Sequence, residues 1–203
     1  MSKRQTTLPS GLPQIWLVTD ARNDATLEWV LQKLPRGSGL IFRHYHLPPA
    51  ERRKRFEALA RIARRRGHAV ALSGDAGTAR RWGADAAYGP PRQLARGPAT
   101  PRLITAHCLR EIAQAHRARA NAIVLSPVYP TRSHPAARAL GLVKFRLLAA
   151  RALVPVIALG GINAHAARRI GATGWAAVDG LCDEATHFSA QPELVEGWIR
   201  EDS

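Results

Sequence analysis

The chain has 203 residues and a formal net charge of +15 at pH 7, from 30 lysine and arginine residues against 15 aspartate and glutamate residues. This length suffices for one well-buried core, so we expect a single domain. The longest apolar stretches are strand-sized and contain glycine or proline, which argues against a membrane span. The short polar N-terminus lacks the apolar region of a secretory signal, and Cys108 and Cys182 have neither disulfide nor zinc-site spacing. We therefore expect a cytoplasmic protein.

Short apolar runs alternate with helical patterns in chain order, beginning with a strand at 14–19 and a helix at 24–34. Further strands are expected at 39–43, 69–73, 86–88, 102–105, 122–125, 156–159 and 176–178. Further helices are expected at 50–66, 76–82, 109–118, 139–152, 164–170 and 192–201. The proline-rich segment 89–101 is expected to be a loop that has lost most of its helix, and 127–135 a long loop where a lid would lie.

Several of these strands are continuously apolar, which is typical of strands covered on both faces of a parallel sheet. Eight strands alternating with helices predict an α/β fold, a compact (β/α)8 TIM barrel over residues 13–203, preceded by a disordered tail at 1–12. The chain is short for that fold, so an open doubly wound sheet is the competing architecture. Against a dinucleotide site, the first strand is followed by Thr19-Asp20-Ala21-Arg22-Asn23 rather than by GxGxxG.

The basic charge raises the alternative of a nucleic-acid-binding protein. Only four of the 30 basic residues are lysines, however, which is typical of GC-rich codon usage. The densest run of arginines, at 52–66, lies on an expected helix whose apolar residues share one face: Phe56, Leu59, Ala60 and Ala63. We expect these arginines to be the solvated face of that helix, without the interleaved aromatic residues of a base-stacking platform. Nucleic acid is therefore not the expected main partner; a steeply salt-dependent affinity would favour that alternative.

Two turns near the C-terminal end have the features of a phosphate site. Gly160 and Gly161 follow the strand expected at 156–159, and Asp179 and Gly180 follow the last expected strand. Glycines let backbone N–H groups approach an anion closely, and the loops after strands 7 and 8 of a (β/α)8 barrel often hold phosphate. The alternative is that Gly160-Gly161 is only a tight turn between a strand and a helix.

In this order the segments resemble the thiamine-phosphate synthase family, and they are similar to its sister branch, the TenI-like thiazole tautomerases. The resemblance covers about residues 15 to 181 and rests on Leu17-Val18-Thr19-Asp20, Arg43, Gly83-Ala84-Asp85, Thr105-Ala106-His107, Leu125-Ser126-Pro127-Val128-Tyr129-Pro130-Thr131, Ala158-Leu159-Gly160-Gly161-Ile162 and Gly171-Ala172-Thr173-Gly174. The family's synthases are (β/α)8 barrels that join hydroxymethylpyrimidine diphosphate to thiazole phosphate and release pyrophosphate with the help of Mg2+. The resemblance therefore implies a transferase of thiamine biosynthesis.

The resemblance also implies roles for residues at the expected barrel mouth. Arg43 matches the first position of the family's diphosphate grip, but Tyr45 stands where a lysine is expected. An alternative for Arg43 is a buried ion pair with Asp20. Thr105 and His107 match a Ser/Thr-x-His motif whose hydroxyl would bind phosphate or pyrimidine, and the alternative for His107 is to start the next helix.

On the loop after strand 6, Thr131 matches the family motif, Ser133 keeps a hydroxyl, His134 replaces a lysine and Arg132 adds a charge. The tautomerases' acid–base histidine corresponds to Pro127, which argues against tautomerase chemistry unless His134 takes over. The resemblance implies catalytic roles for Arg43, Thr105, Thr131, Ser133 and His134, and substrate or phosphate contacts for Arg43, Tyr45, His107, Thr131, Arg132, Ser133, Gly160, Gly161, Asp179 and Gly180. Asp179 would repel a phosphate unless it is protonated, turned away or paired with an arginine.

The family's two metal-binding aspartates are the main departure. The first corresponds to Gly74, unless a one-residue shift brings Asp75 to that position, and the second corresponds to Gln93, which follows Arg92. Mg2+ prefers anionic oxygen ligands, so a metal is expected only if Asp75 holds it. The leading hypothesis is a divergent thiamine-phosphate synthase that acts on small phosphorylated heterocycles, with a homodimer implied by the family. The competing hypothesis is a repurposed phosphate-binding barrel that has lost the diphosphate half of the site.

Overall fold

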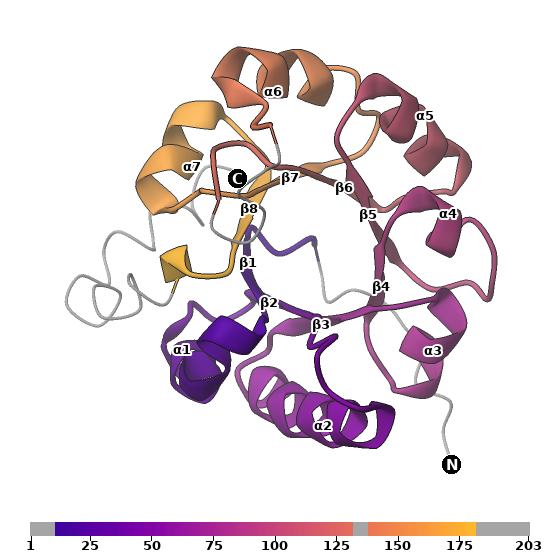
Figure 1. Ribbon diagram of the computed structural model, residues 1–203, viewed down its shortest axis with the longest axis vertical. Helices are drawn as coiled ribbons and strands as arrows, with labels where there is room; N and C mark the ends of the chain where they lie inside the picture. Colours follow the sequence, from indigo (N-terminus) through magenta and orange to yellow (C-terminus); the bar gives the residue numbers. More distant parts are fainter. Residues whose placement is uncertain (1–10, 132–137, 182–203) are drawn as a thin grey trace.

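The computed structural model describes residues 11–131 and 138–181. Eight parallel strands close into a barrel in which neighbours in the chain are hydrogen-bonded and β8 pairs with β1 (Figure 1). The strands are β1 Ile15–Val18, β2 Gly39–Phe42, β3 Ala69–Ser73, β4 Ala86–Gly89, β5 Arg102–Ala106, β6 Ala122–Leu125, β7 Val156–Leu159 and β8 Gly174–Ala177. The closed barrel confirms the predicted (β/α)8 fold and excludes the open doubly wound sheet.

Helices alternate with the strands and form a ring around the barrel (Figure 1). They are the 3-10 helix η1 Ala21–Thr26 and the α-helices α1 Leu27–Lys33, α2 Pro49–Arg65, α3 Ala76–Arg81, α4 Pro91–Leu94, α5 Leu109–Arg117, α6 Gly141–Ala149 and α7 Ala164–Ile170. The helix predicted at 24–34 is divided into η1 and α1, and it begins earlier, at Ala21, where Asp20 and Asn23 form a capping box. The proline-rich segment keeps only the four-residue α4, and the helix predicted at 192–201 lies outside the described residues.

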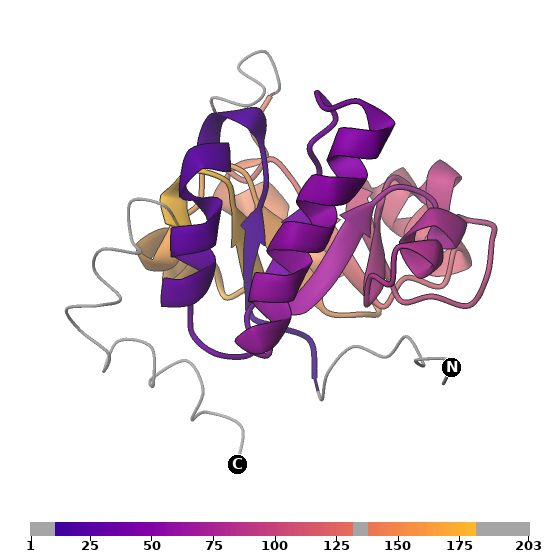
Figure 2. The ribbon, with the colours of Figure 1, turned by 90° about the horizontal axis from the view of Figure 1, so that it is seen from below.

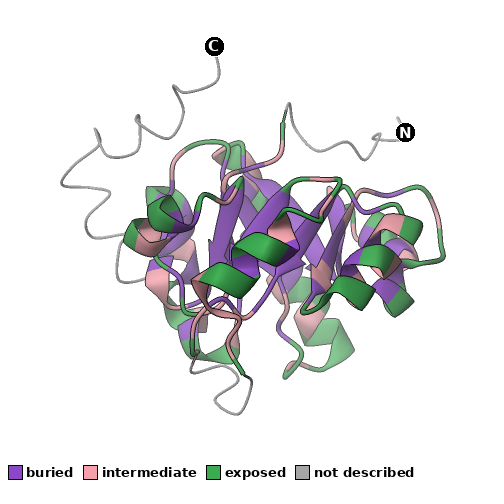
Figure 3. Ribbon diagram, turned by 90° about the horizontal axis from the view of Figure 1, so that it is seen from above, coloured by how far each residue is buried: buried purple, intermediate pink, exposed green. Residues whose placement is uncertain are grey.

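The barrel interior is filled by alternate residues of its own strands. Trp16 is fully buried there, its indole N–H donates to the Pro13 carbonyl at 2.7 Å, and the missing side chain of Gly39 leaves room for its ring. Leu12 packs against this interior cluster, so the last residue of the predicted tail contacts the fold. The opposite faces of the strands pack against the helices, whose outer faces are exposed (Figure 3). No helix among the described residues has the length and apolarity to cross a membrane.

Strand β8 begins two residues before the predicted strand at 176–178. Its first residue, Gly174, lies against the first strand, where an added Cβ would be 3.0 Å from the carbonyl oxygen of Gln14. Trp175 follows it and is buried on the helix-facing side of the sheet. The sequence places this glycine outside the expected strand, but its lack of a side chain allows β8 to approach β1 and close the barrel.

Helices α1 and α2 lie side by side, and α2 packs on the outside of β2 and β3 (Figure 2). The apolar face predicted for α2 is buried. Its arginines are not all solvated, however, which corrects the sequence interpretation. Arg55 donates to the carboxylates of Asp24 and Glu28, and Arg52 reaches inward to two backbone carbonyls at the ends of β2 and β3. These partners come from distant parts of the chain, so a helical pattern alone gives no sign of them.

Candidate active site

A pocket of about 970 Å³ opens at the carboxyl ends of β2 and of β4 to β8. Active sites of (β/α)8 barrels lie at this end. The pocket wall includes nine residues that the sequence singled out, namely Arg43, Tyr45, Thr105, His107, Thr131, Gly160, Gly161, Asp179 and Gly180. Arg132, Ser133 and His134 lie outside the described residues. The fold therefore brings the candidate residues of strands 2, 5, 6, 7 and 8 into one cavity.

The turn after β7 lies tightly against the loop after β6. Gly160 has φ +99° and Gly161 has φ +62°. An added Cβ at Gly160 would lie 2.8 Å from the Cβ of Pro127, and one at Gly161 would lie 2.8 Å from the Cβ of Tyr129. Packing alone thus requires both glycines, as the tight-turn alternative supposed. Within the described residues neither Gly161 nor Gly180 donates its N–H to a backbone carbonyl, so these donors are available to a ligand.

Two cations that the sequence did not single out also line the pocket. Arg138 precedes α6, and Lys144 lies at the start of that helix. Both follow β6 and so belong to the side of the pocket that carries the glycine turns. Positive charge there favours a phosphate. Neither residue falls within a family motif, so only their place in the crossover after strand 6 could have suggested them.

Asp179 is paired with an arginine, which is one of the conditions under which it tolerates a nearby phosphate. Arg22 Nη1 lies 3.4 Å from Asp179 Oδ2, and Arg22 Nε lies 3.0 Å from Asp20 Oδ1. Asp20 also accepts a hydrogen bond from Arg43 Nη2 at 2.9 Å. Although partial burial opposes ionisation, hydrogen bonds from Arg22 and the nearby arginine charges keep the pKa of Asp20 below its usual range. These four side chains form an alternating row of charges between the β8 and β2 sides of the pocket.

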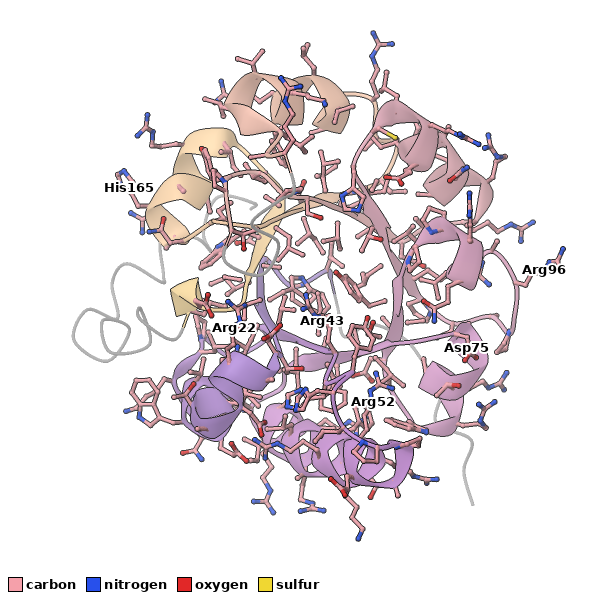
Figure 4. The ribbon with its side chains drawn as sticks, in the orientation of Figure 1. Arg22, Arg43, Arg52, Asp75, Arg96 and His165 are labelled. Carbon is pink, nitrogen blue, oxygen red and sulfur yellow. The ribbon has the colours of Figure 1, made fainter. Side chains whose placement is uncertain are left out.

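Arg43 therefore makes the ion pair with Asp20 and still lines the pocket. The ion pair and a ligand-binding role for this residue are thus compatible. Its side chain points toward the barrel axis (Figure 4). Nε of Arg43 is buried and has no hydrogen-bond partner among the described residues. Asp20 thus fixes the guanidinium through Nη2, while the side chain still lines the pocket.

A buried hydrogen-bond chain supports Arg43 from the β1 side. The Thr19 hydroxyl accepts the Arg43 N–H at 2.8 Å and lies 2.7 Å from His44 Nδ1, while His44 Nε2 lies 2.7 Å from Asp24 Oδ1. Burial lowers the pKa of His44 although Asp24 opposes the shift, so His44 is neutral and donates from Nε2 to Asp24. The arrangement resembles a catalytic triad in its partners only, because Thr19 and His44 are buried and do not line the pocket.

On the β2–β4 side, aromatic hydroxyls and a guanidinium lie where the family resemblance leads us to expect a diphosphate grip. The Tyr45 hydroxyl is hydrogen-bonded to the Ser73 hydroxyl. Tyr88 lines the pocket with only 6% of its surface exposed, and burial raises the pKa of its phenol to about 12, so it stays protonated. Arg52 donates to the carbonyls of Arg43 at 2.9 Å and Ser73 at 2.7 Å. Sequence reasoning missed the roles of Tyr88 and Arg52, since neither is a charged residue in a matched motif.

Asp75, the one candidate metal ligand, does not line the pocket. Its carboxylate caps α3 and accepts from the Thr78 N–H at 2.8 Å and the Thr78 hydroxyl at 2.7 Å. In Figure 4 it lies beside α3, away from Arg43. Gln93 is exposed and its side chain lies over Gly89. Among the described residues no three His, Cys, Asp or Glu side chains gather, and the donors at this end of β2 to β4 are neutral or cationic, a set that does not fit Mg2+.

His107 is held by its backbone and by one ring nitrogen. Its backbone N–H donates to the Glu111 carboxylate at 2.6 Å. This bond helps to start α5, which is the structural role that the sequence left open for His107. Nδ1 lies 2.5 Å from the Ser126 carbonyl oxygen, which can only accept, so Nδ1 carries the proton. In the neutral ring Nε2 is then an acceptor, and the residue lines the pocket.

The family profile described as thiamine monophosphate synthase matches residues 15–181, most of the chain. The chain belongs to the thiamine monophosphate synthase family. The match agrees with the stretch over which the strand and loop motifs resemble that family. A putative thiamine-phosphate synthase 2 from Aquifex aeolicus is 39% identical over 59 residues, which span 29% of this chain and 32% of that protein. The aligned stretch thus covers about a third of that relative's length.

Several solved structures share the fold of this thiamine monophosphate synthase family member at low sequence identity. Thiamine phosphate pyrophosphorylase from Pyrococcus furiosus has a TM-score of 0.76 and 22% identity, covering 92% of this chain and 96% of that one. The protein of the same name from Bacteroides thetaiotaomicron has a TM-score of 0.60 and 14% identity, covering 91% and 98%. An aldolase from Zymomonas mobilis, solved with 3-phosphoglycerate, has a TM-score of 0.59 and 12% identity, covering 93% and 97%. These likenesses show the barrel alone.

Proposed function

We propose that the protein is a divergent thiamine-phosphate synthase that joins hydroxymethylpyrimidine diphosphate to thiazole phosphate. The observation that carries the proposal is a pocket with hydrogen-bond donors and cationic side chains on two separate sides. One side offers the N–H groups of Gly161 and Gly180 together with Lys144, and the other offers Arg43. A reaction between two phosphorylated heterocycles needs this arrangement, because each substrate brings its own phosphate group. Family membership supports the same reaction.

In the proposed reaction the C–O bond between the pyrimidine methylene and the diphosphate breaks, and the diphosphate leaves with the electron pair. The thiazole nitrogen then forms the C–N bond to the methylene, so the products are thiamine phosphate and pyrophosphate. No oxidation or reduction takes place. The chemistry asks the protein to stabilise negative charge on the leaving group and to keep water from the methylene cation.

The pocket residues divide these tasks. The guanidinium of Arg43 would stabilise the charge that grows on the leaving diphosphate. Nε2 of His107 would accept a hydrogen bond from the amino group of the pyrimidine, because Nδ1 is committed to Ser126. Leu159 and Ile162 supply apolar surface to the pocket wall, which helps to exclude water from the reacting carbon.

The test is to incubate the purified full chain with both precursors and measure thiamine phosphate and pyrophosphate. We expect product only when both precursors are present, and we expect Arg43→Gln to lower the rate by about tenfold or more. Arg53→Gln is the matched control, since Arg53 is an exposed residue that pairs with Glu57 on the outer face of α2. Absence of product from folded protein, with EDTA, Mg2+ or Mn2+ in turn, would contradict the proposal.

The second candidate is a phosphate-binding barrel of the same family without synthase activity. Two observations favour it: Asp20 neutralises part of the Arg43 charge, and Asp75 caps a helix instead of facing the pocket. This protein would bind thiazole phosphate but form no product. Calorimetry with thiazole phosphate separates the candidates from each other when combined with the condensation assay, and failure to bind any phosphate ester would rule out both.

A further inference from the structure

Arg52 is a partly buried cation that no carboxylate neutralises among the described residues. Both of its hydrogen bonds go to backbone carbonyls, those of Arg43 and Ser73. Its guanidinium lies over three aromatic rings, with centroid distances of 5.6 Å to Phe42, 5.6 Å to Tyr45 and 5.4 Å to Trp82. The side chain lies between α2 and the barrel (Figure 4). A cation held by carbonyls and rings keeps its full charge, so it favours an anion nearby.

Arg52 also fixes the residues that face the pocket. Its Nε donates to the Arg43 carbonyl and its Nη2 to the Ser73 carbonyl, so it ties the end of β2 to the end of β3. Its contact with the Tyr45 ring and the hydrogen bond between the Tyr45 and Ser73 hydroxyls form a second connection between the ends of β2 and β3. Arg52 itself does not line the pocket. It is therefore a positioning residue, whose charge and hydrogen bonds act through Arg43 and Tyr45.

Tyr88 presents a donor to the pocket on this side. The residue is more than nine-tenths buried, it lines the pocket, and no hydrogen bond within the described part of the chain uses its hydroxyl. Arg43 and Tyr45 line the same pocket as Tyr88. A protonated phenol and a guanidinium both donate to anionic oxygens, whereas neither can bind Mg2+. The donor set is that of an anion site.

We propose that the β2–β4 side of the pocket binds the diphosphate directly through Arg43 and Tyr88, positioned by Arg52, without a divalent metal. The inference rests on the proposed function for the identity of the anion. It differs from the metal-assisted site that family resemblance implies, because fixed cationic and phenolic donors stand where carboxylates would hold the ion. Neither carboxylate expected from the family is available: Asp75 is engaged by Thr78, and Gln93 replaces the other.

The test is calorimetric titration of the full chain with inorganic pyrophosphate, once in EDTA and once in excess Mg2+. We expect the two dissociation constants to agree within about twofold. Tyr88→Phe and Arg43→Gln should each weaken binding about tenfold, which is the usual loss for one hydrogen bond to a charged group. Tyr129→Phe and Arg53→Gln are the matched controls and should bind as the natural chain does, because neither Tyr129 nor Arg53 lines the pocket.

Arg52→Met tests the positioning role. It should weaken pyrophosphate binding about tenfold while thiazole phosphate binding stays within about twofold, since the glycine turns lie on the other side of the pocket. A general loss of structure would weaken both ligands, and that outcome would count against a positioning role. Lys144→Gln completes the set and should affect thiazole phosphate more than pyrophosphate.

Binding that appears only with Mg2+ would overturn the inference, as would equal affinity in Tyr88→Phe, Arg43→Gln and the natural chain. If Lys144→Gln abolished pyrophosphate binding and Tyr88→Phe left it unchanged, pyrophosphate would bind on the glycine side of the pocket. That result would also overturn the inference. These outcomes are independent of the proposed reaction, because titration with pyrophosphate needs no turnover. Condensation that requires Mg2+ would uphold the synthase and reject the metal-free site.

Discussion

The two sides of the pocket are held in place by different parts of the protein. On the β6–β8 side, the positions of the donors follow from backbone turns at Gly160 and Gly161, which pack against the loop after β6. On the β2–β4 side, the positions follow from side chains. The side chains of Thr19 and Arg52 hydrogen-bond to the Arg43 backbone, and His44 hydrogen-bonds to Thr19. A turn is retained or lost as a unit, whereas a set of side chains can be altered one at a time.

This difference explains where the chain agrees with its family and where it departs. The glycine turn needs a particular backbone conformation, so few other residues fit there. The β2–β4 side needs positive charge and donors, and several side chains can supply these in place of a metal and its carboxylates. Four predictions test this difference. The first alters the backbone turn on the β6–β8 side, and the others alter individual titratable side chains.

The largest effect should come from Gly161→Ala. The substitution places a Cβ at φ +62°, within 2.8 Å of the Tyr129 Cβ. The left-handed conformation costs about 1 kcal/mol, and displacement of the loop after β6 adds to this, so we expect a loss of about 3 kcal/mol in the free energy of unfolding. Thiazole phosphate binding should be lost with it. Urea denaturation and calorimetry measure the two effects.

Gly171→Ala is the matched control for that substitution. Gly171 ends α7 with φ +65°, almost the same conformation, but an added Cβ there meets nothing within 4 Å. We expect a loss of about 1 kcal/mol and unchanged ligand binding. Equal losses in the two variants would show that the contact between the two loops does not constrain the turn.

The sequence predicts the barrel well because its signals are local. The strands at 69–73, 122–125 and 156–159 coincide with β3, β6 and β7, since continuous apolar runs mark them without help from distant residues. The sequence places the start of the last strand at 176 instead of 174, because the role of Gly174 in approaching β1 depends on the closed barrel.

The site is predicted less completely, for the same reason. Arg43, Thr105 and Gly161 follow from motifs at strand ends, and the fold alone brings them together. Arg52 and Lys144 act through positions that only the packing of helices against strands creates. One carboxylate, Asp75, has a sequence position compatible with a metal and a three-dimensional position that caps a helix.

Acid should loosen the side-chain-held region of the molecule. The folded-state pKa of His44 lies below its unfolded value, so the unfolded chain takes up the proton first as the pH falls. The stability that neutral His44 contributes is fully present above its unfolded pKa, about 6.5. It begins to be lost as the pH falls below that value, and the loss is complete once the pH has fallen through the lower folded-state pKa. We therefore expect the free energy of unfolding to decrease as the pH falls from about 7.5 to below the unfolded pKa of histidine, measured by urea denaturation.

His44→Asn tests the origin of this pH dependence. His44 has φ +38°, a conformation that asparagine tolerates, so the substitution removes the titrating ring with little backbone strain. We expect a shallower decline in stability with acid. A smaller decline should remain, because burial lowers the pKa of His68 as well. An unchanged slope in the variant would place the pH dependence elsewhere.

A smaller effect is expected at Asp75, where a helix cap and a metal ligand predict different outcomes. Asp75→Ala removes the acceptor for the Thr78 N–H and should cost about 1 kcal/mol of stability. Asp75→Asn keeps a good capping side chain and should cost close to nothing. Neither should change pyrophosphate affinity. If both variants weakened pyrophosphate binding only when Mg2+ is present, Asp75 would be a metal ligand. The proposed metal-free site on the β2–β4 side would then be wrong.

The smallest effect is expected at Asp179, on the boundary between the two sides. Its ion pair with Arg22 is 3.4 Å long and partly exposed, so Asp179→Asn should change the free energy of unfolding by less than about 1 kcal/mol. The substitution removes a negative charge beside the glycine turn and releases Arg22 from one partner, so thiazole phosphate should bind about two- to fivefold more tightly. Asp75→Asn makes the same change in net charge outside the pocket and should leave this affinity unaltered. Weaker binding in Asp179→Asn would mean that the carboxylate serves the ligand, by holding Arg22 in place or by accepting a ligand donor. The row of charges from Arg43 to Asp179 would then act as one unit across both sides of the pocket.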